Sequence, residues 1–167
     1  MEATKLLKRD HDRVKMLFDR YDALGERALE KKQEIFDQLY AEIDVHSKIE
    51  EELFYPAVKN LHSAELQDEV AESIEEHNVV KKLLSELKGL SPEKEEFDAK
   101  MKVLEENVLH HAVEEEEQKM FPQVIQKMSL DDRHELGKKM EARKEVLQAG
   151  WIGAAAAWLR SLMPQTE

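Results

Sequence analysis

The sequence predicts an all-α protein: an up-down-up-down four-helix bundle with an extra C-terminal helix and tail. Apolar residues recur at alternating steps of three and four along four long segments, which is the spacing of a buried helix face. The composition agrees, because 37% of the 167 residues are charged and only 6% are aromatic, with five glycines and four prolines. The segments between the helices are short, which favours antiparallel neighbours.

Four long helices are expected, at about residues 4–24, 29–61, 63–89 and 92–128. Pro56 and Pro122 fall late in the second and fourth helices, where a proline kinks or loosens one turn. Ser129 starts a shorter fifth helix. We expect one domain over residues 1–148, the bundle with its fifth helix, and an apolar tail or helix over residues 149–167. The apolar face of the tail would consist of Trp151, Ala155, Trp158, Leu159 and Leu162, and would dock on the bundle, on a second copy of the chain or on a partner protein.

One histidine and one glutamate interrupt the apolar face of the second helix. The face is formed by Leu39, Ile43, His46, Glu50 and Leu53, whose steps alternate between four and three. The fourth helix repeats the arrangement with Phe97, Met101, Leu104, Val108, His111 and Glu115. A single histidine lies on the apolar face of each preceding helix: His11, 35 residues before His46, and His77, 34 residues before His111. The chain therefore contains an internal repeat of two helices.

Six polar side chains are thus predicted in a core, where they need partners. The chain has no cysteine, so a metal would be held by nitrogen and oxygen alone. Four imidazoles and two carboxylates exceed the ligand set of a tetrahedral zinc ion and suit two octahedral ions such as iron or manganese. Of about 12 coordination positions, four histidines, two bridging carboxylates and an oxo or hydroxo bridge leave about two open. Dioxygen, peroxide or nitric oxide could bind there.

From about residue 4 to residue 148 the chain resembles the hemerythrin-like (HHE cation-binding) family. The resemblance is carried by Asp10-His11, by HSKIEEELFYP at 46–56, by Glu76-His77 and by HHAVEEEEQKMFP at 110–122. It implies a non-haem centre of two iron ions, with manganese or zinc less favoured, held by His11, His46, Glu50, His77, His111 and Glu115. Oxygen-carrying members use five histidines. The four found here make the chain more similar to the sensing and stress-response members.

The two repeats differ by one residue in register. Pro56 and Pro122 are 66 residues apart, whereas His46 and His111 are 65 apart. An extra residue must therefore be absorbed between Glu115 and Pro122, for example in a π-bulge, which tends to occur at functional sites.

The same region of the fourth helix contains a second histidine-glutamate pair that could supply the ligands instead. His110 and Glu114 have the same spacing as His111 and Glu115, but His110 lies about 100° away from the apolar face, so we prefer the second pair. The neighbouring Glu51, Glu52, Glu114, Glu116 and Glu117 are expected on the outer face, where one of them could contact a ligand from outside. The apolar residues expected to wall the site and exclude water include Phe18, Ile43, Ile74 and Val108.

Charge and hydropathy narrow the remaining choices. A net charge of −12 argues against nucleic acid as a partner. No stretch approaches the roughly 20 apolar residues of a membrane span and the N-terminus has no signal-peptide pattern, so the cytoplasm is the expected location.

Three functions compete. The first is a di-iron protein that binds dioxygen or a related molecule for sensing, storage or stress defence. The second is a di-iron enzyme that consumes peroxide or acts as an oxidase. The third is a structural or interaction module in which the metal only holds the bundle together.

Overall fold

The computed structural model describes residues 1–161, and the side chains of residues 1–153; every regular element in that part of the chain is helical. In chain order the elements are α1 (Ala3–Asp22), α2 (Leu29–Ile49), η1 (Glu50–Phe54), α3 (Tyr55–Lys59), α4 (Ala64–Lys88), α5 (Glu95–Leu109), η2 (His110–Met120), α6 (Phe121–Lys127) and α7 (Leu130–Ser161), where η denotes a π-helical segment. Because η1 and α3 continue α2, and η2 and α6 continue α5, the described elements form five rods. None of the described helices is both long enough and apolar enough to cross a bilayer.

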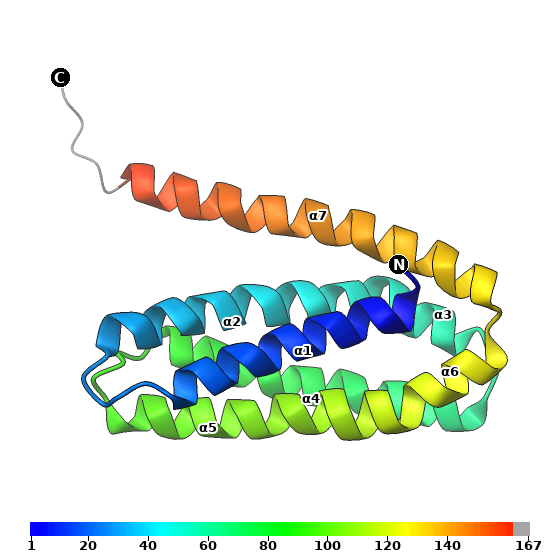
Figure 1. Cartoon of the computed structure of the whole chain (residues 1–167), viewed down its shortest axis with the longest axis horizontal. Coiled ribbons are helices and arrows are strands. Elements are labelled where there is room, and N and C mark those ends of the chain that lie inside the picture. The colour runs from blue at the N-terminus through cyan, green and yellow to red at the C-terminus, as the bar shows by residue number, and fades with distance from the viewer. Residues whose placement is uncertain (162–167) are drawn as a thin grey trace.

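Four of the rods lie side by side, and α7 lies along one side of them (Figure 1). The α1–α2 and α4–α5 connections lie at one end of the bundle, and the α3–α4 and α6–α7 connections lie at the other. Consecutive rods therefore run in opposite directions. The all-α fold expected from the sequence is confirmed, and the four bundle rods end within three residues of the expected positions.

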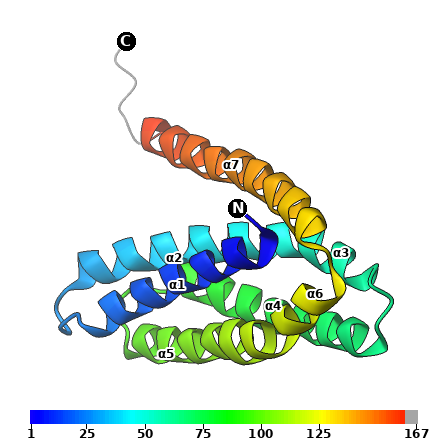
Figure 2. The same cartoon turned by 45° about the vertical axis from the view of Figure 1, so that its right-hand side comes forward.

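The C-terminal part forms one helix, where the sequence led us to expect a short fifth helix followed by a tail or a further helix. Helix α7 is continuous from Leu130 to Ser161, so it crosses the boundary expected after residue 148. Its first turns lie against the bundle and its last turns stand further away (Figures 1 and 2). Of the expected apolar face, Trp151 packs on Tyr40 with ring centroids 5.3 Å apart and donates to Asp44 at 3.0 Å. The other members, Ala155, Trp158, Leu159 and Leu162, lie outside the described side chains.

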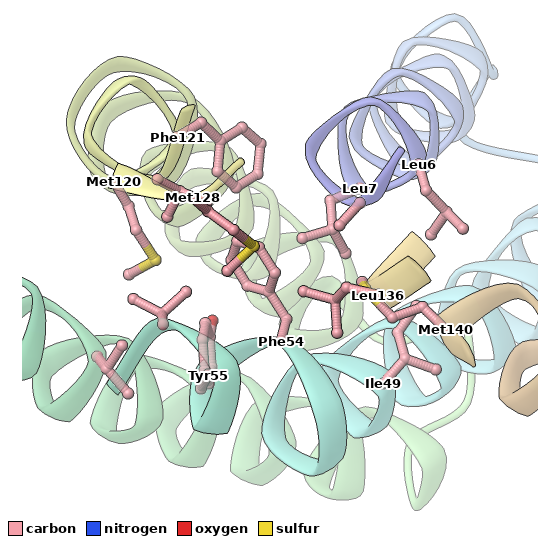
Figure 3. Close-up of a cluster of buried hydrophobic side chains, with 14 of the residues drawn as sticks. Leu6, Leu7, Ile49, Phe54, Tyr55, Met120, Phe121, Met128, Leu136 and Met140 are labelled. Carbon is pink, nitrogen blue, oxygen red and sulfur yellow. The ribbon is translucent and has the colours of Figure 1, made fainter. Parts of the chain in front are cut away.

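Two apolar cores fill the bundle, and a polar layer separates them. In α1, Leu7 belongs to one core and Val14 to the other, with His11 between them. The core near the start of α7 contains Leu6, Leu7, Ile49, Phe54, Tyr55, Met120, Phe121, Met128, Leu136 and Met140, among others (Figure 3). The other core contains Val14, Leu17, Phe18, Tyr21, Ile35, Phe36, Leu39, Ile43, Val80, Leu84, Leu87, Phe97, Met101 and Leu104. The polar layer is therefore enclosed by apolar side chains on both sides.

The start of α7 is part of this architecture. A Cβ atom at Gly137 would clash with the carbonyl oxygen of Met1 and lie 2.9 Å from the Ala3 nitrogen, so only glycine allows this close approach of α7 to the N-terminus. Arg133 donates to the buried carboxylate of Glu2 at 3.0 Å. Helix α7 is therefore docked by specific contacts.

Each repeat contains a π-helical segment directly before an aromatic-proline pair. Segment η1 precedes Tyr55-Pro56, and η2 precedes Phe121-Pro122. A π-helix turns more widely than an α-helix and absorbs an extra residue. The sequence predicted such a feature between Glu115 and Pro122; the π-helical segment is present, but it begins already at His110.

Candidate metal centre

Six buried side chains from the four bundle rods meet in the polar layer between the cores. They are His11 of α1, His46 of α2, Glu50 of η1, His77 of α4, and His111 and Glu116 of η2. The two glutamates are 0% exposed, and the four histidines are between 3% and 8% exposed. Within the described residues these side chains form two groups that could hold a metal ion: His11, His46, Glu50 and Glu116 in the first, and Glu50, His77 and His111 in the second.

The first group is compact. The Nε2 atoms of His11 and His46 lie 3.2 Å apart. His11 Nε2 lies 3.1 Å from Glu116 Oε2, and His46 Nε2 lies 3.0 Å from Glu50 Oε1. Two imidazole nitrogens and two carboxylate oxygens therefore face one small volume.

The second group mirrors the first. The Nε2 atoms of His77 and His111 lie 3.1 Å apart, and His77 Nε2 lies 3.3 Å from Glu50 Oε2. His111 Nε2 lies 3.8 Å from Glu116 Oε2. Because Glu50 turns one oxygen to each group, its carboxylate can bridge two cations.

Tyr55 adds a phenol to the second group. Its hydroxyl donates to Glu116 Oε1 at 3.0 Å and lies 3.4 Å from the Nε2 atoms of both His77 and His111. Burial, together with the negative charges of Glu116 and Glu50, holds the pKa of Tyr55 well above its usual range. The phenol therefore keeps its proton in the metal-free protein. The sequence analysis did not single out this residue, although it belongs to the aromatic-proline pair that follows Glu50.

Glu116, and not the expected Glu115, completes the group of six. The Glu115 carboxylate forms an ion pair with Lys119 at 2.6 Å and lies 3.5 Å from the exposed His110. An α-helix would place residues four apart on one face, but the wider turn of η2 places residues five apart together. His111 and Glu116 consequently point to the same side. The rival pair proposed from the sequence is exposed, with His110 Nδ1 lying 3.2 Å from a Glu114 oxygen.

A constant offset between the repeats would have identified Glu116. Glu50 and Glu116 are 66 residues apart, as are Pro56 and Pro122. The change of register therefore falls between His111 and Glu116, earlier than the sequence analysis placed it.

Each imidazole also meets a carboxylate on its outer side. His11 Nδ1 lies 3.0 Å from Glu117, and His77 Nδ1 lies 2.8 Å from Glu51. These two carboxylates directly follow the inner glutamates in the sequence, so one turn of each π-helical segment supplies both an inner and an outer carboxylate. Such contacts fix the ring tautomer and leave Nε2 free to face a metal.

For His111 and His46, the outer carboxylates are Glu76 and Asp10, which directly precede His77 and His11 in the sequence. His111 Nδ1 lies 2.7 Å from Glu76, and His46 Nδ1 lies 3.7 Å from Asp10. The last distance is longer than a hydrogen bond. The centre is thus built with approximate two-fold symmetry, and the pair formed by His46 and Asp10 departs from it.

Buried carboxylate oxygens without hydrogen bonds, and histidines with raised pKa values, indicate that the site is stabilised by positive charge. Both oxygens of Glu50 and Oε2 of Glu116 are buried without a hydrogen bond. Burial lowers the pKa of His46, but the charges of Glu50 and Asp10 outweigh it and raise this pKa to about 10. The same competition, with Glu50 and Glu51, raises the pKa of His77 to about 9. Protons or metal ions must supply this positive charge, and the nitrogen and oxygen donors fit iron or manganese.

A small apolar cavity adjoins the histidines. It measures about 30 Å³, and its walls are His11, Val14, Ile43, His46, Ser47, His77, Val80, Val108, Leu109, His111 and Ala112. About 10–15 Å³ suffices for one water molecule, so a diatomic molecule fits. Ile43 and Val108 wall the cavity as expected from the sequence. Phe18 and Ile74 lie instead in the neighbouring cores.

Histidines and carboxylates that face one another in the interior of a helical bundle are typical of cation-binding proteins. The chain belongs to the Hemerythrin HHE cation binding domain family, whose model matches residues 2–124. The resemblance drawn from the motifs is therefore confirmed.

The relatives extend the likeness beyond residue 124. Uncharacterized protein Rv2633c of Mycobacterium tuberculosis is 32% identical over 155 residues, which cover 89% of this chain and 88% of that protein. A protein of Nostoc sp. named DNA nickase is 27% identical over 155 residues, and the chain spans only 42% of its length. The crystal structure of the Rv2633c homolog from Mycobacterium kansasii, a Hemerythrin HHE cation binding domain-containing protein, covers 97% of this chain and 94% of its own, with a TM-score of 0.77 and 28% identity. The fold including α7 is therefore shared.

Proposed function

We propose that this chain is a non-haem di-iron protein that binds dioxygen or a related small molecule, such as peroxide or nitric oxide, for sensing, storage or defence against oxidative or nitrosative stress. The observation that carries the proposal is the pairing of four imidazoles and two buried carboxylates with a cavity of about 30 Å³. When bound, two iron ions supply open coordination positions and a reversible change of redox state. A cytoplasmic location is part of the same proposal.

Each proposed ligand has a defined task. His11 and His46 would hold one ion through Nε2, and His77 and His111 would hold the other. Glu50 would be shared by the two ions, because its two oxygens face the two groups. The second carboxylate, Glu116, also faces both groups through Oε2, and we assign it the place that the sequence analysis gave to Glu115.

Tyr55 would make the surroundings of the two ions differ. Its hydroxyl lies within 3.4 Å of both histidines of the second group and donates to Glu116. We assign Tyr55 to the second ion, either as an oxygen donor or as the hydrogen bond that orients Glu116.

The cavity walls select the exogenous ligand. The non-histidine walls are almost entirely aliphatic, so the space favours a small apolar molecule over several waters. Exclusion of water also strengthens the electrostatic contacts inside the site.

Metal analysis and absorption spectroscopy test this proposal. Protein loaded with ferrous iron without oxygen should hold two irons per chain after desalting, and air should produce an absorption band that azide shifts. Ala112→Leu narrows the cavity, so it should weaken azide binding at least tenfold and leave the iron content at two, whereas the exposed Val103→Leu should change neither. A single zinc per chain, or a spectrum unchanged by air, would overturn the proposal.

A peroxide-consuming enzyme is the second candidate. It is favoured by the protonated phenol of Tyr55, because a buried proton donor within 3.4 Å of the proposed ligands can assist the cleavage of an oxygen–oxygen bond. Peroxide loss that continues over many turnovers and falls at least tenfold in Tyr55→Phe, with two irons still bound, would select the enzyme. Stoichiometric reaction in both proteins would select the binder.

A further inference from the structure

We propose that Lys144 of α7 is a positioning residue for the first metal ion, acting through Asp10 on His46. This inference rests on the proposed metal site. It makes the fifth rod part of the centre, so that the ion held by His11 and His46 depends on the docking of α7 and the ion held by His77 and His111 does not.

Lys144 is buried, which is unusual for a lysine. Its residue is 8% exposed, and its Nζ atom lies 2.6 Å from Oδ1 of Asp10, which is 4% exposed. Such a pair holds its carboxylate firmly, because removal of either partner leaves a buried charge without a counter-ion. Lys144 is therefore the closest cation to the Asp10 carboxylate, since Arg9 Nε lies 3.7 Å from the same oxygen.

The other oxygen of Asp10 faces the metal centre. Asp10 Oδ2 lies 3.7 Å from His46 Nδ1, and within the described structure both atoms are buried without a hydrogen bond. The corresponding contacts of the other three histidines are between 2.7 and 3.0 Å. His46 is thus the imidazole whose outer carboxylate stands just beyond hydrogen-bond distance, so a small displacement of Asp10 decides whether that hydrogen bond forms.

Within residues 1–153, the second half of the site has no counterpart to Lys144. Glu76 occupies the position equivalent to Asp10. Besides His111, the ion-pair partner near its carboxylate is the exposed His110, at 3.8 Å, and not a buried lysine. The other two outer carboxylates pair with exposed lysines, Lys8 and Lys81. Among the described side chains of α7, Lys144 alone contacts one of the four outer carboxylates, so the approximate two-fold symmetry is broken at Asp10 by a buried cation.

Neighbouring contacts keep Lys144 in register. Arg143 forms two hydrogen bonds with Glu52 of η1, at 2.6 and 3.0 Å, one residue before Lys144. Gly137 lets α7 approach the N-terminus closely two turns earlier. A displacement of α7 would therefore move the Lys144 ammonium and the Asp10 carboxylate together.

Titration of the full chain with ferrous iron tests the inference, since it measures metal affinity and not activity. Wild type should bind two ions. Lys144→Met should weaken one ion by about 10- to 100-fold, the usual effect of losing a contact behind a ligand, and leave the other within about threefold. Lys144→Arg should restore the affinity. Lys138→Met on the exposed side of the same helix is the matched control and should behave as wild type.

A spectroscopic measurement distinguishes an effect of Lys144 on the position of one metal ligand from a general effect on the stability of the fold. In Mössbauer spectra of protein loaded with two irons, Lys144→Met should shift one of the two iron signals, with the helical circular dichroism unchanged. If Lys144→Met fails to fold, the double variant Asp10→Asn with Lys144→Met leaves no buried charge unpaired and should show the same selective loss.

The outcomes are distinct. Two ions of unchanged affinity in Lys144→Met, or equal weakening of both, would overturn the inference while leaving the proposed di-iron site intact. A wild-type chain that does not bind two ions would overturn the proposed function itself.

Discussion

Replacement of Glu116 by glutamine tests the geometry of the centre most directly. Glutamine has nearly the same shape, so Glu116→Gln creates no cavity; it removes the charge and replaces one oxygen with an NH2 group. Glu115→Gln is the matched control one residue earlier. The contrast decides whether the π-helical register or an α-helical register sets the ligand.

The structure gives the size of the expected contrast. Glu116 is fully buried, and its Oε2 faces both histidine groups without a hydrogen bond. Loss of a contact behind a ligand weakens metal binding by about 10- to 100-fold. Loss of a shared ligand should therefore weaken at least one ion by about 100-fold or more, which is about 2.7 kcal/mol. Glu115 pairs with the exposed Lys119, so its replacement should change stability by less than about 1 kcal/mol and leave metal binding intact.

The assay is iron bound per chain at a series of free iron concentrations without oxygen, combined with thermal unfolding in the presence of a chelator. Retention of both irons by Glu116→Gln, or their loss in Glu115→Gln, would show that the assignment is wrong. If Glu116→Gln and wild type unfold at the same temperature in the chelator, the metal-free fold is unchanged, and a weaker iron affinity arises from the lost ligand.

Three further predictions follow from named contacts. The pKa values of His46 and His77 are raised from 6.5 to about 10 and about 9, so their stabilisation of the metal-free protein is complete below about pH 6.5 and is lost as the pH rises through these values. Melting temperature in a chelator should therefore fall between about pH 7 and 10, and a flat profile would contradict the charge argument. Gly137→Ala should destabilise the protein by about 1–3 kcal/mol or more, whereas Gly150→Ala, which has open space around it, should stabilise it by up to about 1 kcal/mol in urea unfolding; equal effects would refute the close approach of α7. Tyr55→Phe should lower the stability of the metal-free protein by about 1–3 kcal/mol, because Glu116 Oε1 loses its donor, and an unchanged unfolding midpoint would exclude that hydrogen bond.

The positions of the four histidines were predictable because they continue the helical spacing of the buried apolar residues around them. His11, His46, His77 and His111 all continue the three-four spacing of their helices, and that spacing reports which side of a helix is buried. Helix ends were predictable for a similar local reason, since residues that favour helix ends, Ser63 and Gly89, stand at the two cap positions of α4.

The inner carboxylate of the second repeat was not predictable from the same spacing. Glu115, Glu116 and Glu117 are adjacent, and their directions depend on the width of one helical turn. That turn is π-helical in η2, so a rule calibrated on 3.6 residues per turn selects the wrong neighbour. The comparison of the two repeats contained the missing information, because Glu50 and Glu116 keep the offset of the prolines.

By itself, then, the sequence determined the all-α class, the extent of four helices and the burial of four imidazoles, because each depends on periodicity along a single helix. Only the tertiary structure decided that Glu116 faces the centre, that Tyr55 reaches His77 and His111, and that Lys144 stands behind Asp10. These contacts join residues on different rods or depend on the local width of a turn. The distance between two rods and the rotation of each about its axis are fixed by packing of both cores at once, and no pattern within one helix encodes them.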